Sequence, residues 1–404
     1  MSSLPLSGIR VIDLSHSWAA PHCARILGDF GAEVIKVEYQ KRLCILRGGK
    51  KENKHYDHHP AWHQINRSKL GITLDLKCDE DRDILRDLVG ISDVVVENSR
   101  TMVLDRLGFG YEQMAGIKKD IIMLSMSAFG HTGPYSKYVG YGAIFEAVGG
   151  IQSLTAYGDG ERPQRIKELD VTNGITGACA VMTALIHRQA TGRGQHIDLS
   201  QLESATHATI GEHLLEYAVN GTQVKPKGNR HRHYAPQGCY RCKGEDAWVT
   251  ITIRTEEEWQ RFCQVAGHSE WLGDYRFSGR KARRVNHDEL DRKIESWTKE
   301  LGKHEIMNLL QGESIPAGAV FDMDDLNRDP HLKDRQYFSS DVDENGKRFM
   351  GMPFQLSGVK AHVRKAGPNL GEHNIDILTT LLDRSVEDVK NPDEHEIGTA
   401  FDIE

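Results

Sequence analysis

The sequence contains few cysteines and no long apolar run. Seven cysteines are scattered through 404 residues, too few for a disulfide framework, so we expect reduced thiols. No run of eighteen or more apolar residues occurs, which predicts that no segment spans a membrane. The opening residues, MSSLPLSGIRVIDLS, lack the basic and apolar regions of a secretory signal. We therefore expect a cytoplasmic protein.

Motifs for nucleotide binding are also missing. The first β-α turn, SHSWAAPHC, lacks the GxGxxG pattern that lets a backbone approach a pyrophosphate, and no GxxxxGK[ST] phosphate loop occurs. The formal net charge is −7. Broad nucleic-acid binding needs a net basic surface, so this charge argues against it.

A metal site is a possibility that the sequence supports only weakly. His231, His233, Cys239 and Cys242 offer four potential ligands. However, no second paired-cysteine motif follows, and a strand through this segment would point Cys239 and Cys242 to opposite faces. We therefore predict no metal site. A cysteine nucleophile is not expected either, because none of the seven cysteines lies in a setting that would activate it.

The first half of the chain alternates strands and helices. Strands are predicted at GIRVIDLS, AEVIKVE, SDVVVEN and DIIMLSMSAFG, and helices at APHCARILGDFG and DEDRDILRDLVGI. This order predicts an α/β fold with a parallel sheet covered on both faces. Residues 46–69 are polar and rich in turn-forming residues, which indicates a long surface loop.

The second half is helical at first. Residues 150–220 carry an apolar run at helical spacing, with small residues that allow close packing. The apolar run consists of Ile175, Ala178, Met182, Leu185 and Ile186, and the small residues are Gly174, Gly177, Ala178 and Ala180. Beyond a Pro- and Gly-rich linker, CYRCKGEDAWVTITI suggests a hairpin, and helices follow to about residue 312. We predict a large domain in residues 1–224, a small domain in 225–320 and a return segment in 321–404.

Asp170 stands just before this long helical run, in LDVTNG. Aspartate is a favoured N-cap because its oxygen accepts the unpaired amide hydrogens of the first turn. Taken alone, the residue is best interpreted as a helix cap.

Ordered motifs along nearly the whole chain resemble those of the family III CoA-transferases, the group that contains formyl-CoA transferase and carnitine CoA-transferase. They include PLSGIRVIDLSHSWAAPHCARILGDFGAEVIKVE, NRSKLGITLDLK, VVENSRTMVLDRLGFGYE, SAFGHTGPY, RQATGRGQHIDLSQLE and GPNLGEHNIDIL. The resemblance implies a Rossmann-like large domain, a smaller α+β domain and two interlocked ring-like subunits. It also implies an acyl-CoA and a carboxylic acid as substrates, with no permanently bound cofactor.

The resemblance assigns roles to individual residues. It implies that Asp170 is a nucleophile that forms an aspartyl-CoA thioester, and that Tyr141 lies in the substrate pocket. The implied CoA contacts are His16, Ala19, Leu74, Lys77, Asn98 and Arg106. Without the family, His16 would be an ordinary turn residue, Arg106 a surface ion pair and Tyr141 a core aromatic.

Two departures from the family pattern affect the expected site. Family members often carry a basic residue after KVE, where this chain has Tyr39, although Lys41 and Arg42 follow. The glycine-rich lid of the formyl-CoA transferase branch is replaced by a basic segment, residues 228–238.

A carboxylate at a helix start should be held as an anion by the helix dipole. Such a stabilised carboxylate is a poorer nucleophile, so proximity to the bound thioester would have to compensate.

Cationic residues near the nucleophile and in the lid segment suggest a dicarboxylate substrate. They are Arg162, Arg165, Lys167, Arg230, His231, Arg232 and His233. A second carboxylate could pair with an arginine such as Arg232 in bidentate fashion. We therefore expect succinyl-CoA or a similar donor and a substituted succinate or related diacid as acceptor. The alternative is that these charges are simply solvated.

Two alternative functions and the oligomeric form stay open. An α-methylacyl-CoA racemase would need acid and base groups on both faces of an α-carbon, but Tyr141 and Gly142 stand where racemases carry histidine and aspartate. A CoA-binding partner subunit of a heteromeric transferase is a further alternative. The active form is either a homodimer or a heteromer with a related subunit.

Overall fold

The computed structural model describes residues 4–166, 168–339, 348–359, 362–385 and 396–400. The chain divides into two compact units. The first unit comprises Met1–Gln152, Arg165–Thr222 and Leu332–Glu404, and the second comprises Ser153–Gln164 and Gln223–His331. The second unit therefore includes residues 153–164, 223–224 and 321–331 as well as the range 225–320 expected for a small domain.

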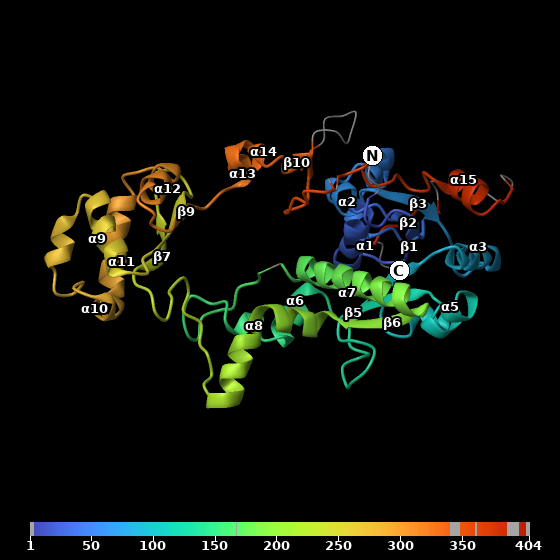
Figure 1. Ribbon diagram of the computed structural model, residues 1–404, viewed down its shortest axis with the longest axis horizontal. Helices are drawn as coiled ribbons and strands as arrows, with labels where there is room; N and C mark the ends of the chain where they lie inside the picture. Colours follow the sequence, from blue (N-terminus) through green and yellow to red (C-terminus); the bar gives the residue numbers. More distant parts are fainter. Residues whose placement is uncertain (1–3, 167, 340–347, 360–361, 386–395, 401–404) are drawn as a thin grey trace. The chain divides into compact units, whose positions relative to one another are not determined.

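A six-stranded sheet forms the centre of the first unit (Figure 1). Its strands are β1 (Arg10–Asp13), β2 (Glu33–Glu38), β3 (Lys69–Thr73), β4 (Val94–Glu97), β5 (Ile122–Ser127) and β6 (Gln195–Ser200). They lie in the order β3-β2-β1-β4-β5-β6, and neighbouring strands are parallel. This confirms the predicted α/β fold. The order is that of a doubly wound, Rossmann-like sheet, in which the winding direction reverses between β1 and β4.

Apolar side chains cover both faces of this sheet, and this explains the nearly continuous apolar character of its strands. In β4, Val94 and Val96 join the core formed with helices α1 and α7, whereas Val95 joins the core formed with α3 and α5. The bounds of these helices are α1 (Ala19–Asp29), α3 (Asp79–Gly90), α5 (Tyr111–Ile117) and α7 (Leu169–Thr191). The remaining helices that lie wholly in this unit are α2 (Pro60–Ile65), α4 (Val103–Arg106), α6 (Gly142–Val148), α8 (Gln201–Asn220) and α15 (Asn374–Asp376).

Helices α1 and α7 approach each other closely at small residues. Gly174, Gly177 and Ala178 of α7 are buried. A Cβ atom added to Gly174 would lie 2.6 Å from His22 Cδ2 and 2.7 Å from the carbonyl oxygen of Ala19. Only glycine fits at this position, so the prediction that these small residues permit close packing is confirmed.

The opposite side of α7 carries exposed apolar residues of the predicted run. Ile175 and Ile186 are 55% and 68% exposed. Within the part of the chain that the structure describes, α7 is the one helix long and apolar enough to cross a membrane by length and composition. Its other side packs on α1 and β5, as the core helix of a globular domain does.

Residues 46–69 do not form the predicted long surface loop. The segment contains short helical turns, including α2, and the side chains of Arg47 and Trp62 are fully buried. Arg47 donates hydrogen bonds of 2.7 Å to both Glu38 and Asp57, and its guanidinium lies 3.7 Å from the centre of the Trp62 ring. Charged groups can be buried when they are paired in this way. A charge-rich composition was therefore a poor guide to exposure here.

The second unit has a core of its own. Strands β7 (Gln237–Arg241), β8 (Trp248–Thr252) and β9 (Ala317–Ala319) form an antiparallel sheet. Helices α9 (Glu256–Val265), α10 (Arg280–Val285), α11 (His287–Thr298) and α12 (Lys303–Gly312) follow the hairpin, and α11 and α12 lie beside this sheet (Figure 1). The predicted hairpin and the helices to residue 312 are confirmed. Short elements complete the chain: α13 (Met323–Arg328), α14 (Pro330–Asp334) and the strand pair β10 (Phe338–Ser339) and β11 (Phe349–Met350).

Candidate active site

A cleft of about 690 Å³ opens in the first unit, beyond the carboxyl ends of β1 and β4. Ligands of doubly wound sheets bind at the point where the winding direction reverses, which here lies between these two strands. Five of the nine predicted site residues line the cleft: His16, Ala19, Asn98, Tyr141 and Asp170. The fold thus brings together residues that are up to 154 positions apart in the sequence, from His16 to Asp170.

Asp170 is the second residue of α7 and lies within its first turn. The N-cap is Glu168, which makes no capping hydrogen bond through its side chain. The interpretation of Asp170 as a helix cap is therefore wrong. A Cβ atom added to Gly142 would lie 3.4 Å from Asp170 Oδ2 and 2.8 Å from Arg165 Nη2. The carboxylate and the guanidinium therefore meet beside the backbone of Gly142.

Burial raises the pKa of Asp170 above its usual value. The Arg165 guanidinium opposes this shift, and the nearby Glu146 carboxylate adds to it. Glu146 is itself buried and accepts a 3.3 Å hydrogen bond from Arg165 Nε. This shift is opposite in direction to the expectation that the helix start holds Asp170 as a strongly stabilised anion, and its main cause is the loss of hydration on burial. A carboxylate with a raised pKa is more basic and a better nucleophile, and such shifts are common at functional sites.

The turn that carries His16 is held in place by the side chain of Asn98. Asn98 Oδ1 accepts a hydrogen bond from the His16 amide, and Asn98 Nδ2 donates one to the His16 carbonyl, both at 2.7 Å. Both polar atoms of the Asn98 side chain are therefore engaged in fixing the turn. The ring of His16 and the buried Ala19, at the start of α1, then face the cleft from a fixed backbone.

A buried cluster of charged side chains also holds the turn between β1 and α1 in place. Asp13, at the end of β1, accepts hydrogen bonds from the Ser15 amide at 2.9 Å and from Lys69 Nζ at 2.7 Å. Lys69 also donates to the carbonyl oxygen of Pro21. Burial alone would raise the pKa of Asp13, but the adjacent Lys36 and Lys69 lower it well below its usual value. The carboxylate therefore stays ionised and anchors the turn between β1 and α1.

Three predicted CoA contacts, Leu74, Lys77 and Arg106, are not among the residues that line the cleft. Leu74 is buried in the core on the α3 side of the sheet. Lys77 is exposed, and its amide bonds to the Asp75 side chain. Arg106 Nε donates to the carbonyl oxygen of Met102 at 3.0 Å. Their roles as CoA contacts stay predictions.

The cleft contains two arginines that were not predicted as site residues, Arg42 and Arg100. Both are exposed, as groups that meet the phosphates of a ligand should be. Arg42 rather than Lys41 supplies the positive charge after β2, because Lys41 pairs with Glu396 at 3.2 Å. Arg100 stands two residues after Asn98, within the VVENSR motif, so its sequence position was the available signal.

Aromatic side chains form one wall of the cleft. Tyr141 is 71% exposed, which rules out the alternative of a core aromatic. Phe129 and Tyr138 also line the cleft, and their rings pack edge to face with centroids 6.1 Å apart. This wall is suited to contact with the apolar parts of an acyl-CoA.

Arg232 belongs to the second unit and lines a different cavity. Of the other predicted cations, Arg230 pairs with Asp288 and Asp291, and Arg165 pairs with Glu146. Lys167 lies outside the described residues. The assignment of Arg232 to the substrate pocket stays a prediction.

No group of three or more His, Cys, Asp or Glu residues that could hold a metal is found among the described residues. Cys239 is half-buried and Cys242 is buried, and burial raises the pKa of both thiols, to about 11 for Cys242. The four potential ligands discussed above do not assemble into such a group.

Comparison with known proteins identifies the family. The model of CoA-transferase family III matches residues 6–374. The chain belongs to this family. It is 31% identical over 390 residues to a succinyl-CoA–D-citramalate CoA-transferase of Chloroflexus aurantiacus, with 95% of this chain and 96% of the relative covered. The β subunit of a succinyl-CoA–L-malate CoA-transferase from the same organism is 30% identical, with 96% of this chain and 98% of that subunit covered.

The fold also matches a solved structure. The crystal structure of a CAIB/BAIF family protein from Brucella suis superimposes with a TM-score of 0.86 at 29% identity, and the match covers 94% of this chain and all of that one. The protein is therefore a family III CoA-transferase.

Proposed function

We propose that this CoA-transferase moves CoA from a dicarboxylic acyl-CoA, such as succinyl-CoA, to a dicarboxylic acid through a covalent intermediate on Asp170. The observation that carries the proposal is the placement of Asp170 in one cleft with His16, Ala19 and two exposed arginines. The arginines are suited to the phosphates of CoA, and the half-buried carboxylate has the raised pKa of a good nucleophile.

In the first half of the reaction, an oxygen of the Asp170 carboxylate attacks the thioester carbon of the donor. The C–S bond breaks, giving a mixed anhydride and CoA thiolate. The thiolate then attacks the aspartyl carbonyl of the anhydride. The donor acid leaves as a carboxylate, and CoA is now bound to Asp170 as a thioester.

The second half reverses these steps with the acceptor. The acceptor carboxylate attacks the aspartyl thioester and releases CoA thiolate, which then attacks the acceptor carbonyl of the new anhydride. The products are the acceptor acyl-CoA and the free Asp170 carboxylate. Because each anhydride would hydrolyse in water, the closed site must exclude water during these steps.

The choice of a dicarboxylate rests on the relatives and on charge. Both relatives described above are named for succinyl-CoA and for a diacid. A monocarboxylic acid uses its single carboxylate in the reaction, whereas a diacid keeps a second one that an arginine can bind. Arg165 already pairs with Glu146, so Arg42 and Arg100 are the arginines of the cleft that we assign to carboxylate or phosphate recognition.

Acceptor choice tests the substrate proposal. With succinyl-CoA as donor, we expect kcat/KM for a diacid acceptor such as methylsuccinate to exceed that for butyrate by about 100-fold, since a charged pair is worth roughly 1.5–3 kcal/mol. Initial rates of acyl-CoA formation by the purified chain, followed by liquid chromatography, measure this ratio. Equal rates with butyrate would contradict the dicarboxylate assignment. Turnover by the chain alone would also exclude the partner-subunit alternative.

We further propose that the active form contains two chains. The exposed apolar residues of α7, together with Leu214, Leu215 and Val219 of α8, are the surfaces that a second subunit would cover. One of the relatives above is the β subunit of a transferase, so the second chain is either a copy of this one or a related subunit.

A further inference from the structure

The second unit contains a cavity of about 680 Å³, and its wall is built from that unit alone. The wall comes from Tyr157, from the loop that precedes β7, from β7 itself, and from α10 and α11. Its volume is within the range of small-molecule sites. The residues that line it and those that line the Asp170 cleft do not overlap.

The wall of this cavity is strongly cationic. Its basic side chains are Lys227, Arg230, Arg232, Arg284 and Arg292, and its acidic side chains are Asp291 and Glu295. Five positive and two negative groups leave a formal charge of +3. The whole chain carries −7, so this concentration of positive charge is local.

Both acidic side chains of the wall already form ion pairs. Asp291 pairs with Arg230 at 2.6 Å and also accepts a 2.8 Å hydrogen bond from the Tyr240 hydroxyl. Glu295 pairs with Lys299 at 3.4 Å. The two carboxylates of the wall therefore neutralise one of its five cations, Arg230.

The other four cations form no ion pair with a carboxylate among the described residues. They are Lys227, Arg232, Arg284 and Arg292, and Arg292 donates through Nε to the main-chain carbonyl of Asp288. Cations gathered in one concave surface repel each other and attract anions.

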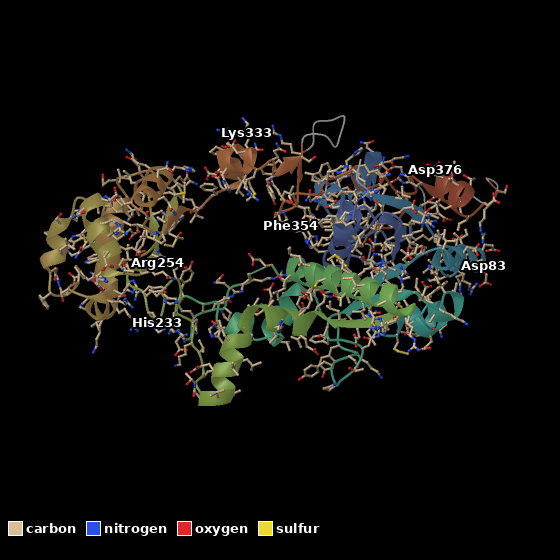
Figure 2. All side chains as sticks on the ribbon, in the orientation of Figure 1. Asp83, His233, Arg254, Lys333, Phe354 and Asp376 are labelled. Carbon is tan, nitrogen blue, oxygen red and sulfur yellow. The ribbon has the colours of Figure 1, made fainter. Side chains whose placement is uncertain are left out.

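The titration of a neighbouring histidine reflects this field. The pKa of His233, which is labelled in Figure 2, is lowered first by desolvation and then by Arg232, His231 and Arg284. Arg232 and Arg284 are both part of the cavity wall. They come from different elements, and so the positive field comes from the loop and from α10 together.

We propose that this cavity binds a small anion that carries at least two negative charges, such as a dicarboxylate or a phosphate compound. Arginine forks match carboxylate and phosphate oxygens in bidentate geometry, and the four unpaired cations require more than one negative charge to balance them. The proposal does not depend on the chemistry of Asp170, because the site is built from other residues.

Calorimetric titration of the full-length Asp170→Asn protein tests this proposal without turnover. The probes are succinate, pyrophosphate and, as a monoanion control, butyrate. We expect succinate or pyrophosphate to bind at least about tenfold more tightly than butyrate. Whichever of these two probes binds more tightly shows whether the natural anion is a dicarboxylate or a phosphate compound. In the same Asp170→Asn protein, the double substitution Arg284→Gln and Arg292→Gln should weaken this binding by at least about tenfold.

Matched variants separate the cavity from general charge effects. Lys281→Gln removes one exposed cation from α10 outside the cavity wall, and it should leave binding unchanged. Arg232→Gln alters only the loop, so it keeps the test valid if the helix variants fail to fold. The proposal is wrong if neither dianion binds, if butyrate binds equally well, or if the cavity variants and Lys281→Gln give the same affinity.

Discussion

Replacing Asp170 by asparagine is expected to lower kcat for CoA transfer by roughly 10⁴-fold or more, the range seen when a covalent nucleophile is removed. Asparagine keeps the size of the side chain but cannot supply the attacking oxygen anion. The KM for acyl-CoA should change little, because the arginines and the turn at His16 are untouched. Steady-state kinetics with succinyl-CoA measure both quantities.

The same substitution should leave the protein as stable as before, or more stable, at neutral pH. Burial raises the folded-state pKa of Asp170 above its unfolded value. The stability that comes from this group is present below the unfolded pKa and is lost as the pH rises through the folded pKa. At pH 7 the ionised group therefore destabilises the fold, and asparagine removes that cost. Thermal unfolding at pH 7 should show an equal or higher midpoint.

Glu168→Gln is the matched control, since Glu168 is an exposed carboxylate two residues earlier that makes no capping bond. Its kcat should stay within about twofold of the wild type, as for a change at an exposed side chain without a capping role. If Asp170→Asn retained activity comparable to that of Glu168→Gln, Asp170 would not be the nucleophile.

Gly174→Ala is expected to destabilise the first unit by about 1–3 kcal/mol, the usual cost of overpacking a core. The added Cβ would lie 2.7 Å from the main-chain oxygen of Ala19, which cannot move without shifting α1. Gly174 lies one helical turn after Asp170, so kcat should fall as well. Urea unfolding at a fixed protein concentration measures the change in stability.

Gly211→Ala provides the control for this prediction. Gly211 lies inside α8, and apart from its own stretch of helix no atom of the described residues lies within 4 Å of an added Cβ. Alanine should therefore stabilise α8 by roughly 0.5–1 kcal/mol relative to glycine. Equal effects of the two substitutions, in either direction, would contradict the close packing of α1 on α7.

The sequence predicted the sheet because its strands are buried on both faces. Val94, Val95 and Val96 form an unbroken apolar run, and the structure places them alternately in the two cores. The stretch 46–69 was misjudged for the converse reason. Arg47 is charged yet fully buried, because Glu38 and Asp57 pair with it, and such pairing across the fold cannot be read from local composition.

The candidate site residues could be named from motifs, but the charges around them could not be predicted from the sequence. Asp170, His16 and Tyr141 were found because they stand at motif positions, and they share one cleft. Arg42 and Arg100 were not chosen as site residues, although Arg100 belongs to the VVENSR motif, because their place in the cleft depends on how the fold brings separate loops together. The direction of the Asp170 pKa shift depends on burial and on Glu146, which is 24 residues away in the sequence. A local rule based on the helix terminus takes neither of these causes into account.

Mass spectrometry of the wild-type protein incubated with succinyl-CoA alone tests the covalent mechanism most directly. Without an acceptor, the reaction should stop with CoA bound to the enzyme. After acid quenching and digestion, the peptide that contains Asp170 should carry the mass of CoA less one water, and Asp170→Asn should show no such adduct. An active wild-type enzyme that gives no adduct, or an adduct on a different carboxylate such as Glu146, would contradict the proposed mechanism.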